Sequence, residues 1–159
     1  MTTEATSSIE ADRIVRSIRI KAPRSRVWRA LSDAPEYGKW FGVNLAGQTF
    51  AAGQPVKGQF TIRGHEHMFF EVVIDKVEPE NLLSYRWHPN AVEANADRAS
   101  EPTTLVTFTL KDAEGGTMVT VTETGFEHLP AARRLEAYRG NSKGWDWQMN
   151  NLLNHVNNN

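Results

Sequence analysis

The fold is decided by residues 135–156, LEAYRGNSKGWDWQMNNLLNHV, near the end of the chain. Apolar or small side chains recur in this stretch at spacings of three and four, namely Leu135, Tyr138, Ser142, Trp145, Met149, Leu152 and Val156. That period places them on one stripe of an α-helix, with charged and amide side chains on the opposite side. Since propensity alone rarely holds such a helix, the stripe needs a surface to pack against. The preceding segments have the pattern of β-strands, so we expect a helix packed on a sheet.

The bulk composition is that of one globular domain. A chain of 159 residues is long enough to bury its own core. With 18 basic and 19 acidic residues, it has no strong field of one sign, so we expect neither nucleic acid nor a membrane as partner. The absence of cysteine excludes disulfides, thiolate metal sites and cysteine nucleophiles. Neither a signal peptide nor an apolar run of membrane-spanning length is present, so a cytoplasmic location is expected by default.

The order of elements predicts an α+β fold. We expect residues 1–11 to be a flexible tail and residues 12–159 to form a single domain. A first strand at 14–20 precedes two short helices, one from Pro23 to about Leu31 and one at 36–41. The later strands are expected at 45–50, 56–62, 68–77, 82–87, 103–111 and 117–124. The result is a curved antiparallel sheet of about seven strands around the long C-terminal helix. The polar segment 88–102 is interpreted either as a pocket rim or as a solvent loop.

Several local motifs resemble those of one superfamily. Residues 18–31, IRIKAPRSRVWRAL, resemble the opening motif of the SRPBCC (START/Bet v-like) proteins, I-x-A-P-x-x-x-V-W-x-A-L. Residues 33–41, DAPEYGKWF, and 77–87, VEPENLLSYRW, are similar to the next two motifs in the same order. Residues 117–126, TMVTVTETGF, resemble the closing strand of these proteins, and the pair Gly144-Trp145 resembles part of their closing helix. Together the motifs are typical of the subgroup that resembles activators of the heat-shock-protein-90 ATPase.

This resemblance implies the helix-grip (START/Bet v-like) fold and a cavity between its sheet and its long helix. It favours a small hydrophobic or aromatic molecule as partner, and leaves a homodimer open. One alternative is a cyclase/aromatase-like or hydrolase-like enzyme that uses the same cavity. Another is a co-chaperone that stimulates a heat-shock-protein-90 ATPase. The known activators resemble this chain only in their C-terminal half, so we do not expect a chaperone partner.

The expected cavity would be lined by large apolar side chains on the inner face of the sheet and on the helix. Such walls with few polar groups suit a hydrophobic ligand. The alternative is that the side chains themselves fill the space, as in packed protein interiors. The candidate wall residues are Trp40, Phe41, Phe60, Met68, Phe70, Tyr85, Trp87, Phe108, Trp145 and Met149.

Two charged residues fall on strand faces that are otherwise apolar. Arg16 alternates with three isoleucines, and Glu123 alternates with Val119 and Val121. In the helix-grip arrangement the first and last strands are neighbours, so we expect these two charges to meet, because an unpaired buried charge is costly. The pair could be a polar anchor for a ligand carboxylate or hydroxyl, or a purely structural ion pair.

The remaining candidates for chemistry give weaker signals. His65 and His67 have the spacing of two metal ligands, but alternation places them outside and no third ligand is evident, so we expect no metal. His88, His128 and His155 are expected at the surface. The sequence contains no nucleophile elbow, phosphate-binding loop or dinucleotide fingerprint, so we predict no cofactor and favour a protein that is not an enzyme. General acid–base chemistry by Glu123, Tyr85 or His67 would be implied only by the cyclase-like relatives.

Two glycines interrupt the C-terminal helix. Gly140 and Gly144 each weaken it by about 1 kcal/mol relative to alanine. Close packing of the helix on the sheet is the favoured interpretation, and a hinge at a cavity entrance is the alternative.

Overall fold

The computed structural model describes residues 13–89 and 101–158. The expected tail at 1–11 and most of the polar segment 88–102 lie outside these residues. The elements, in chain order, are β1 (Arg13–Ile20), α2 (Arg24–Ser32), α3 (Ala34–Phe41), β2 (Pro55–Gln59), β3 (Phe69–Glu78), β4 (Leu82–Trp87), β5 (Thr104–Ala113), β6 (Gly116–Thr124), the 3-10 turn η1 (Phe126–His128) and α4 (Ala131–Asn157).

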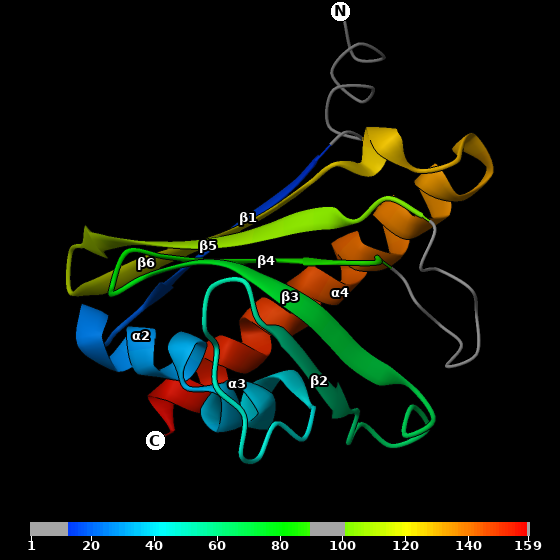
Figure 1. Ribbon diagram of the computed structural model, residues 1–159. Coiled ribbons are helices and arrows are strands. Elements are labelled where there is room, and N and C mark those ends of the chain that lie inside the picture. The colour runs from blue at the N-terminus through cyan, green and yellow to red at the C-terminus, as the bar shows by residue number, and fades with distance from the viewer. Residues whose placement is uncertain (1–12, 90–100, 159) are drawn as a thin grey trace, which may run out of the picture.

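The strands form one antiparallel sheet in the order β1-β6-β5-β4-β3-β2. As predicted, the first and last strands are neighbours: Ile14 lies opposite Glu123 and Arg16 opposite Val121. Helix α4 crosses one face of the sheet, and α2 and α3 lie beside its C-terminal end (Figure 1). The α+β helix-grip fold is therefore confirmed, with the apolar core enclosed between the sheet and α4.

The described residues contain six strands rather than about seven, because residues 45–50 do not form the expected strand. Gly47 takes a positive φ of 76° in this segment, which breaks an extended backbone. Leu45 and Phe50 are buried nonetheless. The side-chain amide of Gln48 donates to the backbone oxygen of Lys57 and accepts from its backbone N–H. Gln48 thus satisfies backbone groups at the free edge of β2 that a neighbouring strand would otherwise bond.

The predicted apolar stripe of α4 is confirmed in its C-terminal half. Trp145, Met149, Leu152 and Val156 are all buried against the rest of the fold. The prediction is wrong for Leu135, whose side chain is 50% exposed. In that first part of the helix Ala137 is buried instead, and Tyr138 packs on Phe126 of η1 with ring centroids 5.5 Å apart. Of the two stripe residues in that part of the helix, Tyr138 therefore packs on η1 as the stripe predicts, while Leu135 does not pack.

Replacing Gly144 by alanine is expected to stabilise the protein by about 1 kcal/mol, the usual difference in helix propensity. The expected close packing is wrong at this position, because an added Cβ would have no neighbour within 4 Å. Chemical denaturation would measure the gain. Gly38→Ala is the matched control, since its added Cβ would collide with the carbonyl oxygen of Val43 and should destabilise the protein. A loss of stability in Gly144→Ala would contradict the prediction.

Candidate functional site

The candidate wall residues meet in one cluster beneath α4. All eight aromatic members contact at least one other member, with ring centroids 5.3–6.5 Å apart. Met149 is buried with them, while Met68 precedes β3 and is only partly buried. Phe60 and Trp87 are also partly buried, so the aromatic cluster extends to the protein surface. The side chains thus pack on one another where we expected them to line a cavity.

Tyr37, at the centre of this cluster, was missed in the sequence. Its ring contacts Trp40 at 4.7 Å and Phe41 at 5.1 Å between centroids, and it also meets rings from the sheet. Helical spacing could have identified it, because Tyr37 lies three positions before Trp40 and four before Phe41, and residues at these spacings share one side of a helix.

Two buried phenols bond to each other inside the cluster. The hydroxyl oxygens of Tyr37 and Tyr85 lie 2.6 Å apart. Burial raises the pKa of Tyr37 well above the usual value, and the hydrogen bond to Tyr85 offsets only part of this. Burial likewise raises the pKa of Tyr85, and the nearby Tyr37 and the charge of Glu123 raise it further. Both phenols therefore remain neutral at physiological pH.

Glu123, near the end of β6, is the buried carboxylate of the interior, with 0% exposure. Its Oε1 accepts from the indole N–H of Trp145 at 2.8 Å, and its Oε2 from the indole N–H of Trp87 at 2.9 Å. The hydroxyl of Thr104 donates to Oε2 at 2.5 Å, and the amide of Asn141 lies 3.0 Å from both oxygens. We call these four donors and Glu123 the carboxylate cluster. It joins three adjacent strands to α4.

The expected pairing of Arg16 with Glu123 is wrong. Arg16 faces the same side as Ile14, as predicted, but its Nε donates to Asp146 on α4 at 2.6 Å. The register explains the difference, because Ile14 rather than Arg16 lies opposite Glu123. The long Arg16 side chain instead reaches the solvent-exposed flank of the helix, where water and Asp146 both stabilise its charge.

Asn141 and Thr104 are the polar residues of this site that sequence reasoning missed. Asn141 lies four positions before Trp145, so helical spacing could have placed it on the same side. Thr104 lies opposite Trp87 in the β4–β5 ladder. No local pattern signals that pairing, because it depends on the register between two strands.

A second charged cluster holds the C-terminal end of α4. Glu36 on α3 accepts from Arg26 at 2.7 Å and from Arg29 at 3.2 Å, and it bonds the imidazole of His155 at 2.9 Å. Burial alone would raise the pKa of Glu36, but hydrogen bonds from His155 and Arg26 hold it below the usual value. The surface position expected for His155 is therefore wrong, since its side chain is only 15% exposed.

The other histidines give no sign of a metal centre. His65, His67 and His128 are exposed, and His88 is partly buried with its ring bonded to the backbone oxygen of Glu101. Within residues 13–89 and 101–158, no three His, Cys, Asp or Glu side chains are placed to hold a metal ion. In the same residues, no helix is both long and apolar enough to span a membrane.

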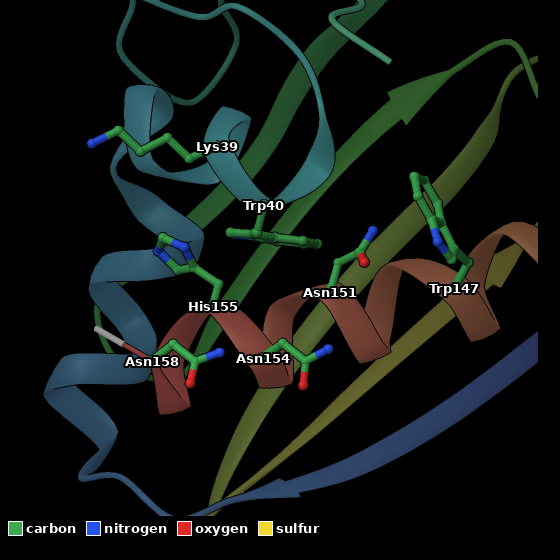
Figure 2. Close-up of a pocket in the computed structure, with 7 residues that line it drawn as sticks. All are labelled: Lys39, Trp40, Trp147, Asn151, Asn154, His155 and Asn158. Carbon is green, nitrogen blue, oxygen red and sulfur yellow. The ribbon is translucent and has the colours of Figure 1, made fainter. Parts of the chain in front are cut away.

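An open pocket of ≈ 340 Å³ lies outside this interior, between α3 and the C-terminal half of α4 (Figure 2). Trp40 is a member of the aromatic cluster that also lines this pocket: it is 5% exposed, and its indole N–H is bonded to the backbone oxygen of Ala30 at 2.8 Å. Trp147 on α4 is 50% exposed. The lining residues are Lys39, Trp40, Trp147, Asn151, Asn154, His155 and Asn158.

The sheet, the crossing helix and the aromatic interior define a helix-grip domain of the SRPBCC superfamily. Residues 21–157 match the family model described as Activator of Hsp90 ATPase homolog 1-like protein, and the chain belongs to this family. The superfamily and subgroup indicated by the sequence motifs are thus confirmed. No curated protein matches the chain.

Solved structures share the fold. A protein in the dynemicin biosynthetic locus, DynU16, has a TM-score of 0.71 and 23% identity over 92% of this chain, which spans only 47% of DynU16. MLL2253 from Mesorhizobium loti has a TM-score of 0.69 and 24% identity, covering 92% of this chain and 97% of its own. A protein from Arthrobacter aurescens has a TM-score of 0.75 and 16% identity, and the match covers 95% of this chain and 89% of that protein. At these identities the likeness concerns the fold alone.

Proposed function

We propose that this protein binds a small hydrophobic or aromatic molecule between the sheet and α4, next to the carboxylate cluster. The observation that carries the proposal is the position of Glu123. Its buried carboxylate adjoins an aromatic cluster that reaches the surface at the partly buried rings of Phe60 and Trp87. Apolar walls with a few fixed polar groups are typical of ligand sites, where the polar groups orient the ligand.

The binding site must open to admit a ligand, because the rings contact one another. Helix α4 offers a place for this movement, since Gly140 and Gly144 flank Asn141 and lower local helix stability. A displacement of this segment would separate Asn141 and Trp145 from Glu123. We therefore expect a ligand to enter at the end of the sheet where Trp87 and Asn141 lie.

The polar groups of the interior favour binding over catalysis. The phenols of Tyr37 and Tyr85 are neutral and bonded to each other, and both oxygens of Glu123 already accept hydrogen bonds. A general base needs a lone pair directed at the reacting proton. Here the lone pairs of the Glu123 carboxylate already accept hydrogen bonds that connect the strands to α4.

Thermal unfolding with a panel of lipophilic and aromatic compounds tests the proposal. A compound present at 100 times its Kd should raise the free energy of unfolding by about 2.7 kcal/mol, or the Tm by roughly 5–10 °C for a chain of this size. The shift should be reduced in Trp145→Phe, which keeps an aromatic ring but loses the N–H bonded to Glu123.

Trp147→Ala is the matched control, because this tryptophan lies on the same helix but is half exposed, outside the interior. It should show the same ligand-induced shift as the unmodified protein. The absence of a shift with every compound would contradict the proposal. Stimulation of an Hsp90 ATPase by a protein unresponsive to the whole panel would favour the co-chaperone alternative instead.

A further inference from the structure

We propose that the ligand of this site carries a protonated amino group, and that this group binds Glu123 in the place now taken by Asn141. The inference rests on the proposed function, and it names the chemical class of the ligand. The evidence is the charge balance of the carboxylate cluster, the geometry of Asn141 and the pair of indole rings beside Glu123.

Within residues 13–89 and 101–158, the charge of Glu123 has no partner of opposite sign. Its donors are two indole N–H groups, one hydroxyl and one amide, all of them neutral. In the part of the chain that the structure describes, no Lys, Arg or His side chain forms an ion pair with Glu123, and Arg16, the partner expected from the sequence, is bonded to Asp146. Buried charges are normally paired, because hydrogen bonds from neutral groups offset only part of the cost of removing a carboxylate from water. A cationic ligand would supply the missing charge.

Asn141 is the donor that a ligand can replace most readily. Its single amide nitrogen is shared between Oε1 and Oε2 at 3.0 Å each, whereas each indole donates to one oxygen at 2.8–2.9 Å. Asn141 is also partly exposed, and it belongs to the segment of α4 between two glycines. An ammonium group in its place has three N–H donors and so can bond both oxygens.

The aromatic rings around Glu123 suit the apolar part of an aromatic amine. The rings of Trp87 and Trp145 lie 5.9 Å apart at their centroids, and Phe41 lies 6.2 and 6.1 Å from them. These rings supply apolar walls for the aromatic part of the ligand, while both indoles turn their N–H edges toward Glu123, so the attraction for the amino group comes from the carboxylate. A ligand carboxylate would instead meet Glu123 as a like charge, which disfavours the acid considered from the sequence alone.

Three ligands that differ only in one group test the inference: tryptamine, the neutral 3-ethylindole and indole-3-propionate, each measured by calorimetry with the full chain. Because hydrogen bonds to charged groups are worth about 1.5–3 kcal/mol, the amine should bind roughly 10- to 100-fold more tightly than the neutral indole. The acid should bind more weakly than either. The preference for the amine should disappear in Glu123→Gln and should increase in Asn141→Ala, where the competing donor is absent.

Asp146→Asn is the matched control, because it also removes one carboxylate but on the exposed side of α4, where Asp146 pairs with Arg16. It should leave the preference for the amine unchanged. If the neutral indole binds the unmodified protein as tightly as tryptamine, the inference is overturned while the proposed function stands. If none of the three binds at millimolar concentration, both are contradicted. The comparison in the unmodified protein decides the inference even if Glu123→Gln does not fold.

Discussion

Replacing Glu123 by alanine is expected to lower the free energy of unfolding by about 3–5 kcal/mol, because several buried donors lose their acceptor at about 1–3 kcal/mol each. The substitution leaves the N–H groups of Trp87 and Trp145 and the amide of Asn141 without their acceptor in the interior. A buried donor without an acceptor still bears its desolvation penalty, and the hydrogen bond that compensated this penalty is lost. It also removes the side chain that connects β4, β5 and β6 to α4.

Urea denaturation monitored by tryptophan fluorescence and by circular dichroism would measure this loss. Glu136→Ala is the control, since Glu136 is exposed on α4 and a surface change there should stay within about 0.5 kcal/mol. Glu123→Gln should fall between the two, because its amide oxygen can accept from one indole while its NH₂ group faces other donors. A loss below about 1 kcal/mol in Glu123→Ala would show that water or rearranged side chains satisfy these donors, contrary to the prediction.

At alkaline pH the buried phenol pair is expected to destabilise the protein steeply. The pKa values of Tyr37 and Tyr85 are raised above the unfolded value of 10.0, so their contribution is fully present below pH 10.0 and is lost as the pH rises beyond it. In that range each tyrosine lowers the free energy of unfolding by about 1.4 kcal/mol per pH unit, because only the unfolded chain releases the proton. By pH 11.5 the pair should cost about 4 kcal/mol.

Urea titrations at pH 8, 10 and 11.5 would test this dependence. Tyr37→Phe should lose about 1 kcal/mol at pH 8 with the hydrogen bond to Tyr85, and should then show about half of the alkaline loss. An alkaline loss of the same size in Tyr37→Phe and in the unmodified protein would contradict the assignment. Absorbance at 295 nm adds a second measurement, because the two phenolates should form only as the protein unfolds.

Much of the fold could be predicted because local patterns carry it. The period-two alternation of 69–78 and 104–113 and the helical period of 145–156 each reflect one buried face. Prediction was wrong where tertiary context decides. Residues 45–50 contain buried apolar side chains but no strand, and Leu135 continues the stripe of α4 yet is 50% exposed.

The candidate site was predictable in its apolar part and not in its polar part. Large aromatic side chains at inward positions of strands and helices can be recognised one segment at a time, and the eight predicted ones do meet. The partners of Glu123 come from three further elements, so they depend on strand register and on the position of α4. The expected Arg16 pairing was wrong for the same reason, since a shift of two residues along the ladder separates Arg16 from Glu123.

The sequence by itself determined the helix-grip order of elements, the family motifs and the aromatic character of the interior, because these follow from side-chain periodicity along single segments. Only the tertiary structure decided that Glu123 is buried among neutral donors and that Arg16 turns to Asp146. The physical reason is that hydrogen bonds and charge pairs act over about 3 Å. Their partners are therefore fixed by strand register and helix placement, which only the assembled sheet and helix define.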